Sequence, residues 1–409
     1  MKKVFFCCLV SLLVLFAAGV KVEAVSFTII AKSGDTIAGK TLASVGLNTA
    51  TLNDNGVAAF WAGYSGNSLE GIFTQSSLLV KEGDTIGGKT LTDIGDSIKL
   101  SLNNNNNVAF KGSFSGGTGI FTRNNLVAEI GDTIDTKTLT SVNGQASIND
   151  SDNVAFQGFF SGGSGVFINN SSMAAGTGSV IGGETINSTG GTDNPFIDAS
   201  GGVSFRASTN GDGSIFTPDS ILVSEGDIID GKTLGLITHN VMNASGNVAF
   251  RSNISGGGKG IFTTNSLIAE IGDSIGGKIL TDISGSGGML SLGNNGDIAF
   301  QGSFAGGTGI FTQNSLIAAS GDTIAGGGTI DIFAGSTSIN ANGDVLFGVR
   351  FQDTFETALI LATVDAQPVP EPATIALLGI GLAGLALLLD NFLPDRSTKF
   401  KTISAQSFL

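Results

Sequence analysis

The chain has 409 residues, of which 62 are Gly and only 13% are charged. This composition excludes a mainly helical enzyme and is typical of a strand-and-turn protein, because Gly is favoured wherever the backbone turns with a positive φ angle. The formal charge of −14 argues against nucleic acid as a partner, since an acidic protein repels phosphate backbones. The two cysteines, Cys7 and Cys8, lie near the N-terminus, so the rest of the chain has no disulfide or thiolate metal site.

The first 24 residues have the order of a secretory signal peptide. Met1–Lys3 carry positive charge, Val4–Val20 are almost all apolar, and Ala24 supplies the small residue that signal peptidases require. This order predicts export of the protein, with cleavage after Ala24.

Residues 25–364 form a tandem repeat with a period of about 48 residues, close to the periods of propeller repeats. Short β-rich runs between Gly- and Asn-rich turns predict four strands per unit, as in Val108–Phe114, Gly119–Thr122, Leu126–Ile130 and Thr138–Val142. One marker is a Gly-Asp pair, degenerate at Gly178-Ser179, with aspartates at Asp35, Asp84, Asp132, Asp227, Asp273 and Asp322. A second is a Phe after an Asn/Gly-rich turn, at Phe60, Phe110, Phe156, Phe205, Phe250, Phe300 and Phe347.

The phase of the repeat distinguishes two architectures. The body starts in mid-unit with Phe27–Ile30 and stops in mid-unit with Ala358–Leu361, and the two parts add up to one unit. A closed ring needs such complementary ends, because pairing them removes the exposed sheet edges. The sequence therefore favours an all-β, seven-bladed β-propeller whose last blade joins both ends of the body. A β-solenoid with two coils per repeat is the alternative.

The C-terminal region predicts a short linker, residues 365–372, followed by an apolar helix. Residues 373–389 carry no charge, and at about 1.5 Å per residue they reach roughly 25 Å, the short limit for crossing a bilayer. We expect this transmembrane helix to hold the protein at the membrane, with a short tail over residues 390–409.

Val369, Pro370, Glu371, Pro372 and Ala373, together with this helix, resemble the sorting segment of PEP-CTERM proteins. The resemblance implies recognition and cleavage by an exosortase in a Gram-negative bacterium that makes extracellular polysaccharide. The family pattern places an Arg-rich cluster directly after the helix, whereas Asp390-Asn391 follows here. A plain tail anchor is the alternative.

The body resembles the tandem-repeat proteins marked by Asn-x-x-Gly-x-x-Ala-Phe. Asn53–Phe60 and Asn243–Phe250 carry the motif, whereas Asn104–Phe110 lacks the Gly. This resemblance implies no activity.

Several motifs that look chemical are better explained as repeat turns. Gly83–Thr90 matches the Walker A pattern, but strand-like residues follow where a phosphate loop needs a helix. The aspartates of the Gly-Asp pairs occupy one place in each unit, which predicts turn capping rather than the single acid–base pair of a glycosidase. His239 is the only histidine and is predicted to be a solvent-facing turn residue without a metal partner.

Calcium is a weaker hypothesis. The turns Asn53–Asn55 and Asn149–Asp152 offer oxygen ligands of the kind that Ca²⁺ prefers. Asn and Asp also stabilise tight turns without a metal. We predict no bound metal and no catalytic residues.

These expectations give two functional hypotheses. The first is an exported, exosortase-sorted and non-catalytic protein of the cell surface or extracellular matrix, with a role in adhesion or in organising biofilm and exopolysaccharide. It predicts an inner-membrane intermediate before release to the surface, with exosortase, the membrane and extracellular polysaccharide as partners. The alternative is a propeller that binds or acts on polysaccharide at its central face.

Overall fold

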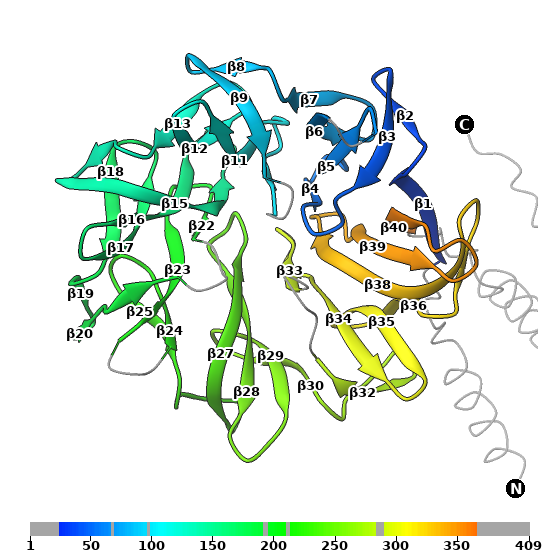
Figure 1. The fold of residues 1–409 in the computed structure, drawn as a ribbon. Helices are drawn as coiled ribbons and strands as arrows, with labels where there is room; N and C mark the ends of the chain where they lie inside the picture. The colour runs from blue at the N-terminus through cyan, green and yellow to red at the C-terminus, as the bar shows by residue number, and fades with distance from the viewer. Residues whose placement is uncertain are drawn as a thin grey trace, which may run out of the picture. The chain divides into compact units, whose positions relative to one another are not determined.

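The computed structural model describes residues 24–66, 69–95, 99–190, 195–209, 213–283 and 290–365. Within these ranges every regular element is a β-strand, and neighbouring strands of a sheet pair antiparallel. The strands form seven blades around a common centre, as in a propeller (Figure 1), and a separate two-stranded sheet of β19 and β20 accompanies the fourth blade. The predicted seven-bladed propeller is confirmed, and the solenoid alternative is wrong.

The first four blades, counted from the N-terminal side, follow one plan of short entry strand, inner strand and three further strands. Blade 1 has β2 (Thr36–Ile37), β3 (Lys40–Val45), β4 (Thr51–Leu52), β5 (Ala58–Tyr64), β6 (Leu69–Thr74) and β7 (Leu78–Lys81). Blade 2 has β8 (Thr85–Ile86), β9 (Lys89–Ile94), β10 (Ser101–Leu102), β11 (Val108–Phe114), β12 (Gly117–Thr122) and β13 (Leu126–Glu129). Blade 3 has β14 (Thr133–Ile134), β15 (Lys137–Ile148), β16 (Val154–Phe160), β17 (Gly163–Ile168) and β18 (Ser172–Gly176). Blade 4 has β19 (Val180–Ile181), β20 (Glu184–Thr185), β21 (Ser188–Thr189), β22 (Phe196–Ile197), β23 (Val203–Ser208), β24 (Gly213–Phe216) and β25 (Ile221–Ser224).

The remaining three blades repeat this plan. Blade 5 has β26 (Ile228–Ile229), β27 (Lys232–Met242), β28 (Val248–Ile254), β29 (Lys259–Thr263) and β30 (Leu267–Glu270). Blade 6 has β31 (Ser274–Ile275), β32 (Lys278–Asp282), β33 (Leu290–Leu292), β34 (Ile298–Phe304), β35 (Gly307–Thr312) and β36 (Leu316–Ala319). Blade 7 has β37 (Thr323–Ile324), β38 (Gly328–Ile339), β39 (Val345–Phe351), β40 (Thr357–Asp365) and β1 (Ala24–Lys32).

Blade 7 closes the ring with strands from both ends of the body. Its sheet has the order β1-β40-β39-β38-β37, so the N-terminal strand supplies the outermost strand (Figure 1). The hydroxyls of Ser26 and Thr363 are hydrogen-bonded at 2.5 Å, and the ammonium of Lys32 lies 3.3 Å from the carboxylate of Glu356. This closure is the one that the phase of the repeat predicts, and it leaves β40 without an unpaired edge.

The Asn/Gly-rich turns explain both the repeat motif and its exceptions. The fourth residue of the first turn, Gly56, has a φ of +75°, where a β-carbon is disfavoured. In the second and third turns Asn106 and Asp152 occupy this position with φ values of +59° and +62°. Asn and Asp tolerate the left-handed region better than other non-Gly residues, so the motif survives without its Gly.

The core of each blade is built around a pair of phenylalanines. In six blades the Phe that follows the turn stacks on a Phe of the next strand, as Phe60 does on Phe73 with ring centroids 6.3 Å apart. Both rings of that pair are fully buried. The periodic Phe markers are therefore core positions rather than ligand-binding ones.

The predicted signal peptide before Ala24, the sorting helix over residues 373–389 and the tail over residues 390–409 lie outside the described residues. Among the residues that the structure does describe, none forms a helix long and apolar enough to cross a membrane.

Candidate functional site

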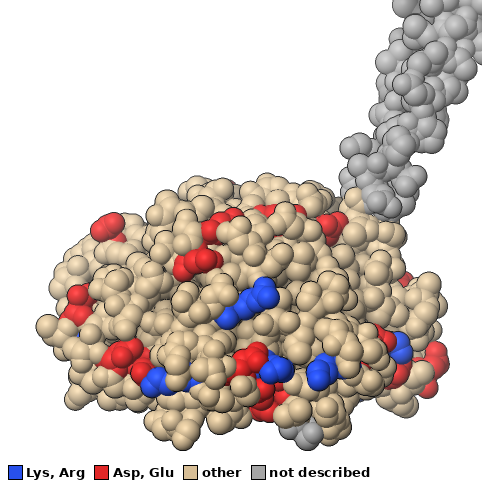
Figure 2. Space-filling model, turned by 90° about the horizontal axis from the view of Figure 1, so that it is seen from above, with Lys and Arg blue, Asp and Glu red and all other residues tan. Residues whose placement is uncertain are grey.

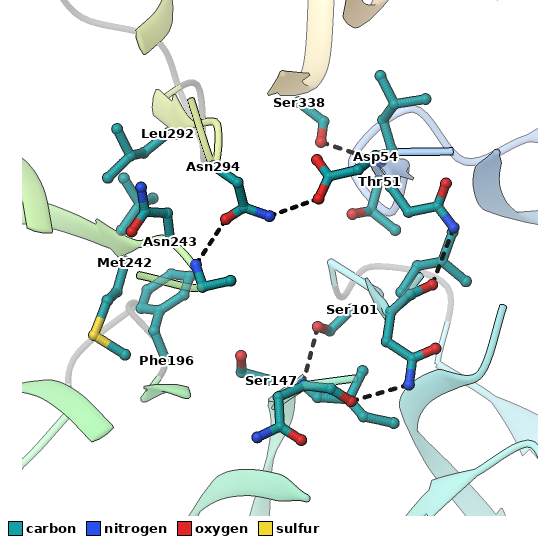
Figure 3. A pocket seen from close by; sticks show the side chains of 18 of the residues that line it. Thr51, Asp54, Ser101, Ser147, Phe196, Met242, Asn243, Leu292, Asn294 and Ser338 are labelled. Carbon is teal, nitrogen blue, oxygen red and sulfur yellow. Dashed lines mark hydrogen bonds between the residues drawn. The ribbon is translucent and has the colours of Figure 1, made fainter. Parts of the chain in front are cut away.

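A cavity of about 200 Å³ lies at the centre of the ring, and residues of all seven blades line it (Figure 3). Each blade contributes the end of its inner strand, and blades 1 to 6 also contribute residues of the turn that follows. Five blades place a hydroxyl two residues before the first residue of the turn, and blades 4 and 5 place an apolar side chain there. These seven residues are Thr51, Ser101, Ser147, Phe196, Val241, Ser291 and Ser338.

Four of the hydroxyls join neighbouring blades. The Oγ of Ser338 accepts a hydrogen bond of 3.1 Å from the N–H of Leu52, one blade further along the ring. The Oγ atoms of Ser101, Ser147 and Ser291 accept equivalent bonds of 3.1–3.2 Å from Ile148, Ile197 and Ile339. These N–H groups belong to inner strands, which have no further strand to pair with on the side of the axis.

The first residue of each turn has two roles. The side-chain oxygen of Asn103 accepts the N–H groups of Asn105 and Asn107, which closes its own turn. Its amide nitrogen donates to the backbone oxygen of Asn149 in the next blade, at 3.0 Å. Asn53, Asn149 and Asn243 donate to the next blade in the same way. The Asn of the repeat motif is therefore a blade-to-blade connector as well as a turn residue.

Two carboxylates line the cavity at the turns, and both are held by amides. One oxygen of Asp54 accepts the N–H of Ala341 at 2.8 Å, and the other accepts the amide of Asn294 at 2.6 Å (Figure 3). Asp150 accepts both the N–H and the side-chain amide of Asn104, at 2.8 and 3.0 Å. The negative charge at this end of the cavity is thus partly compensated by fixed N–H dipoles.

Lys99 is the one lysine or arginine among the described residues that line this cavity. Its side chain crosses from blade 2 to blade 7, where the Nζ lies 3.4 Å from the backbone oxygen of Thr337. Burial lowers the pKa of Lys99 to about 8, because the charged ammonium loses hydration. The ammonium is nevertheless the charged form at neutral pH.

A central binding face was one of the two functional hypotheses, but the residues that line this cavity were not predicted. The Gly-Asp pairs and Phe residues that marked the repeat occupy turns and the core. The signal that was present is the Ser or Thr two residues before the first residue of the turn in five of the seven units. A hydroxyl that recurs on the innermost strand of most predicted blades would have indicated a polar central channel.

The Gly-Asp aspartates are turn caps, as predicted. Asp227 accepts the N–H of Ser224, three residues earlier, at 2.8 Å. The other five aspartates make the same bond at 2.7–2.9 Å. In the degenerate copy the Oγ of Ser179 accepts the N–H of Gly176 at 3.0 Å. Conservation of this bond through a change of residue type supports a role in the turn rather than in chemistry.

Gly83–Thr90 forms a β-hairpin, in which Thr85 pairs with Thr90 across β8 and β9. It is therefore a repeat turn and lacks the helix that a phosphate loop needs. Several of the oxygens considered for calcium accept hydrogen bonds within the protein. For example, an oxygen of Asp152 accepts the amides of Asn103 and Asn107 at 2.7 and 3.0 Å.

The prediction for His239 was wrong. The residue lies on the inner strand β27 rather than in a turn, and it is partly buried between blades 5 and 6. Its Nδ1 is 2.9 Å from the Nη2 of Arg251, and since Arg only donates, Nδ1 is the acceptor. Burial, and then the charges of Arg251 and Arg206, lower the pKa of His239 to about 4.

Three carboxylates meet where blade 1 joins blade 2. Glu70, Glu82 and Asp93 each place an oxygen within 4.8 Å of the other two. Burial and then the charge of Asp93 raise the pKa of Glu82. At the junction of blades 5 and 6, Lys259 stands at the position that corresponds to Glu70, and Asp282 at the position that corresponds to Asp93. There the ammonium of Lys259 forms an ion pair with the carboxylate of Asp282 at 2.9 Å. The junction of blades 1 and 2 therefore gathers three carboxylates, whereas the junction of blades 5 and 6 pairs a carboxylate with an ammonium.

On the face drawn in Figure 2, acidic and basic side chains are interspersed on a surface that is otherwise uncharged. The described lysines are also largely engaged, as with Lys232 at 2.8 Å from Glu270.

The sorting motif predicted at Val369–Ala373 lies outside the described residues, and comparison with protein families addresses it directly. Residues 368–388 match the model of the PEP-CTERM protein-sorting motif. A search of the curated proteins found no match to this chain.

Comparison with solved structures finds matches of very low sequence identity. BBS1N in complex with ARL6DN is 9% identical, with a TM-score of 0.36, and the match covers 84% of this chain and 97% of that one. The PQQ-bound aldose sugar dehydrogenase of Streptomyces coelicolor is 8% identical, with a TM-score of 0.31 and coverage of 84% and 99%. Trypanosoma rangeli sialidase with sialic acid is 11% identical, with a TM-score of 0.31, and the match covers 94% of this chain and 63% of that one.

The match at residues 368–388 shows a PEP-CTERM protein-sorting motif, and the strand order shows the fold. The PEP-CTERM motif implies processing by an exosortase, and proteins that carry it are exported and sorted to the cell surface. This chain is therefore an exported protein in which a seven-bladed β-propeller precedes a PEP-CTERM protein-sorting motif.

Proposed function

We propose that the protein is a non-catalytic component of the cell surface or extracellular matrix that organises extracellular polysaccharide in adhesion or biofilm formation. The observation that carries the proposal is the sorting motif at residues 368–388 behind a closed propeller. Such a motif sorts a protein to the cell surface, where extracellular polysaccharide is found. A closed propeller leaves only the short outer strand of a blade with a free edge, which limits unwanted pairing with other chains in a crowded matrix.

The bonding of the repeated polar residues supports a structural body. The Gly-Asp aspartates cap turns, and the first Asn of four turns connects one blade to the next. A glycosidase needs a proton donor beside a nucleophile or base. The two carboxylates that line the cavity, Asp54 and Asp150, both accept amide hydrogen bonds within the described part of the chain. This arrangement favours binding over hydrolysis.

The alternative of a polysaccharide-binding propeller is favoured by one observation, the central cavity with its hydroxyls and its single lysine. The two proposals are compatible, because a matrix protein needs a binding site for its polymer.

A deletion strain tests the proposed function. We expect loss of the gene to reduce cell aggregation and the polysaccharide retained on cells, and the wild-type gene to restore both. A gene with Pro370, Glu371 and Pro372 replaced by Ala should be expressed at the same level and fail to restore them. Gln367→Ala, just outside the motif, is the matched control and should behave as wild type. Unchanged aggregation and matrix retention in the deletion strain would remove the proposal.

A further inference from the structure

The hydroxyls around the central cavity have hydrogen-bonding capacity left. A serine hydroxyl has one proton to donate and can also accept. Ser101, Ser147, Ser291 and Ser338 each accept one backbone N–H, and no described protein atom accepts their protons. All four line the cavity. Their wall is therefore rich in donors and complements a ligand that is rich in acceptors.

The ammonium of Lys99 adds a positive charge to the same side. It extends from blade 2 toward blade 7, so it lies along the arc of blades that supply the serines. Its one described hydrogen bond, to the oxygen of Thr337, is long at 3.4 Å. The desolvation of this ammonium is not offset by any described carboxylate, which is why its pKa is lowered. An anionic ligand would supply the negative charge to pair with this ammonium.

At the place where blades 2, 3, 6 and 7 have a serine, blades 4 and 5 line the cavity with apolar side chains, Phe196 and Val241. Phe196 is partly exposed and is labelled among the lining residues in Figure 3. A sugar ring has a similar division, with C–H groups on its faces and hydroxyls at its rim. Aromatic and aliphatic side chains bury such C–H faces, whereas the polar arc receives the oxygens.

We propose that the central cavity binds a carboxylate-bearing sugar unit, a hexuronate, with its carboxylate at Lys99, its oxygens on the serine arc and one ring face against Phe196. The volume of about 200 Å³ suits one small polar unit, being below the about 300–1,000 Å³ of clefts for drug-sized ligands. Asp54 and Asp150 also line the cavity, but they lie in the turns, whereas Lys99 lies four residues before the turn of its own blade. Both carboxylates accept hydrogen bonds from side-chain amides. The inference rests on the proposed role in organising polysaccharide and names the chemistry of that polymer.

Calorimetry on the full chain in detergent tests the site. The probes are glucuronate, galacturonate, glucose, acetate, sulfate and a short oligouronate. We expect a hexuronate to bind at least about tenfold more tightly than glucose or acetate, because only it offers both charge and ring. If the oligouronate binds and the free acids do not, the site takes a polymer end. Equal binding of acetate, sulfate and hexuronate would reduce the site to a simple anion site and overturn the sugar assignment.

Proton uptake on the wild-type protein gives a test without a variant. At pH 8 Lys99 is about half protonated when the cavity is empty, and a bound carboxylate would complete its protonation. Binding should therefore take up about half a proton at pH 8 and almost none at pH 6, measured from heats in buffers of different ionisation enthalpy. Uptake that is zero at both pH values would contradict the role of Lys99.

Lys99→Met should weaken hexuronate binding at least about tenfold and leave glucose binding unchanged. Lys232→Met is the matched control, since it removes an equal charge from an ion pair outside the cavity. Circular dichroism confirms that both variants fold. Hexuronate affinity that is unchanged in Lys99→Met overturns the inference, and a surface phenotype in the deletion strain would still support the proposed function.

Discussion

The ring of Phe27 meets the ring of Phe347 edge-on, with centroids 6.4 Å apart and planes inclined by 85°. The two residues lie at opposite ends of the body, on β1 and β39 of the closing blade. In other blades the Phe that follows the turn stacks on a Phe of the next strand. In blade 7 its aromatic partner Phe27 comes instead from the N-terminal strand β1. This contact, and the pairing of β1 with β40, turns an open array of repeats into a ring.

Phe27→Ala should therefore destabilise the whole body. Because Phe27 is only partly buried, we expect a loss of about 2 kcal/mol, below the about 3–5 kcal/mol of a fully buried Phe. Thr28→Ala, an exposed position on the same strand, should change stability by less than about 0.5 kcal/mol. Urea unfolding of both variants checks this, and equal effects at the two positions would show that the closing contact carries no special weight.

The blade-to-blade amides make a second prediction. Asn103→Ala removes two acceptor bonds within its turn and two donor bonds to blade 3, all at a buried position. We expect a loss of about 2–4 kcal/mol, because the groups left behind are buried without partners. Asn124→Ala, which changes an exposed side chain of the same blade, is the control and should be nearly neutral. Thermal or urea unfolding distinguishes the two.

The Gly-Asp turns predict which substitutions the repeat tolerates. Asp227→Ala should cost about 1 kcal/mol by leaving the N–H of Ser224 without its cap. Asp227→Ser should recover most of that loss, because Ser179 makes the same bond in the neighbouring unit. Stability curves of the two variants measure the difference. Equal loss in both would contradict the capping role.

The single histidine predicts a pH dependence with a definite sign. The pKa of His239 is about 4 in the folded protein, below its ordinary value of 6.5. The folded state therefore binds fewer protons between these pH values, and stability present above pH 6.5 is lost as the pH falls toward 4. The loss is at most about 3 kcal/mol. His239→Gln should remove this component of the pH dependence in urea unfolding.

Nuclear magnetic resonance gives the direct check on His239. Its imidazole is the only one in the chain, so its signals need no assignment by mutation. A midpoint near pH 4 is expected, since protonating Nδ1 would break the bond from Arg251 and add a third charge beside Arg206. A midpoint near 6.5 would mean that the histidine faces solvent, as the sequence had suggested.

The fold was largely predictable from the sequence because it depends on periodic features. The Gly-Asp pairs and Phe markers fix the number of units, and the half-units at Phe27–Ile30 and Ala358–Leu361 fix the closure. Each of these signals acts within one blade or at the ends of the chain. Such local constraints are visible in a single sequence.

The site was not predictable in the same way, because it arises between blades. The bond from Asn53 to Asn103 joins residues one full repeat apart, and its geometry depends on how two blades pack. His239 was predicted in a turn but lies inside the long inner strand β27, where Asn240, of a residue type common in turns, follows it. No other unit has a lysine at the place of Lys99, four residues before the turn, where Thr49, Gln145, His239 and Ser336 stand in other units, so no periodic signal marked it.

The most direct test of the account is mass spectrometry of both termini of the mature protein, after separating inner membrane, outer membrane and medium. Strains with and without the exosortase should be compared. We predict an N-terminus at Val25 in both strains, and a C-terminus near residues 370–372 with the body away from the inner membrane only where the exosortase is present. An intact C-terminus at Leu409 that stays in the inner membrane of both strains would contradict it.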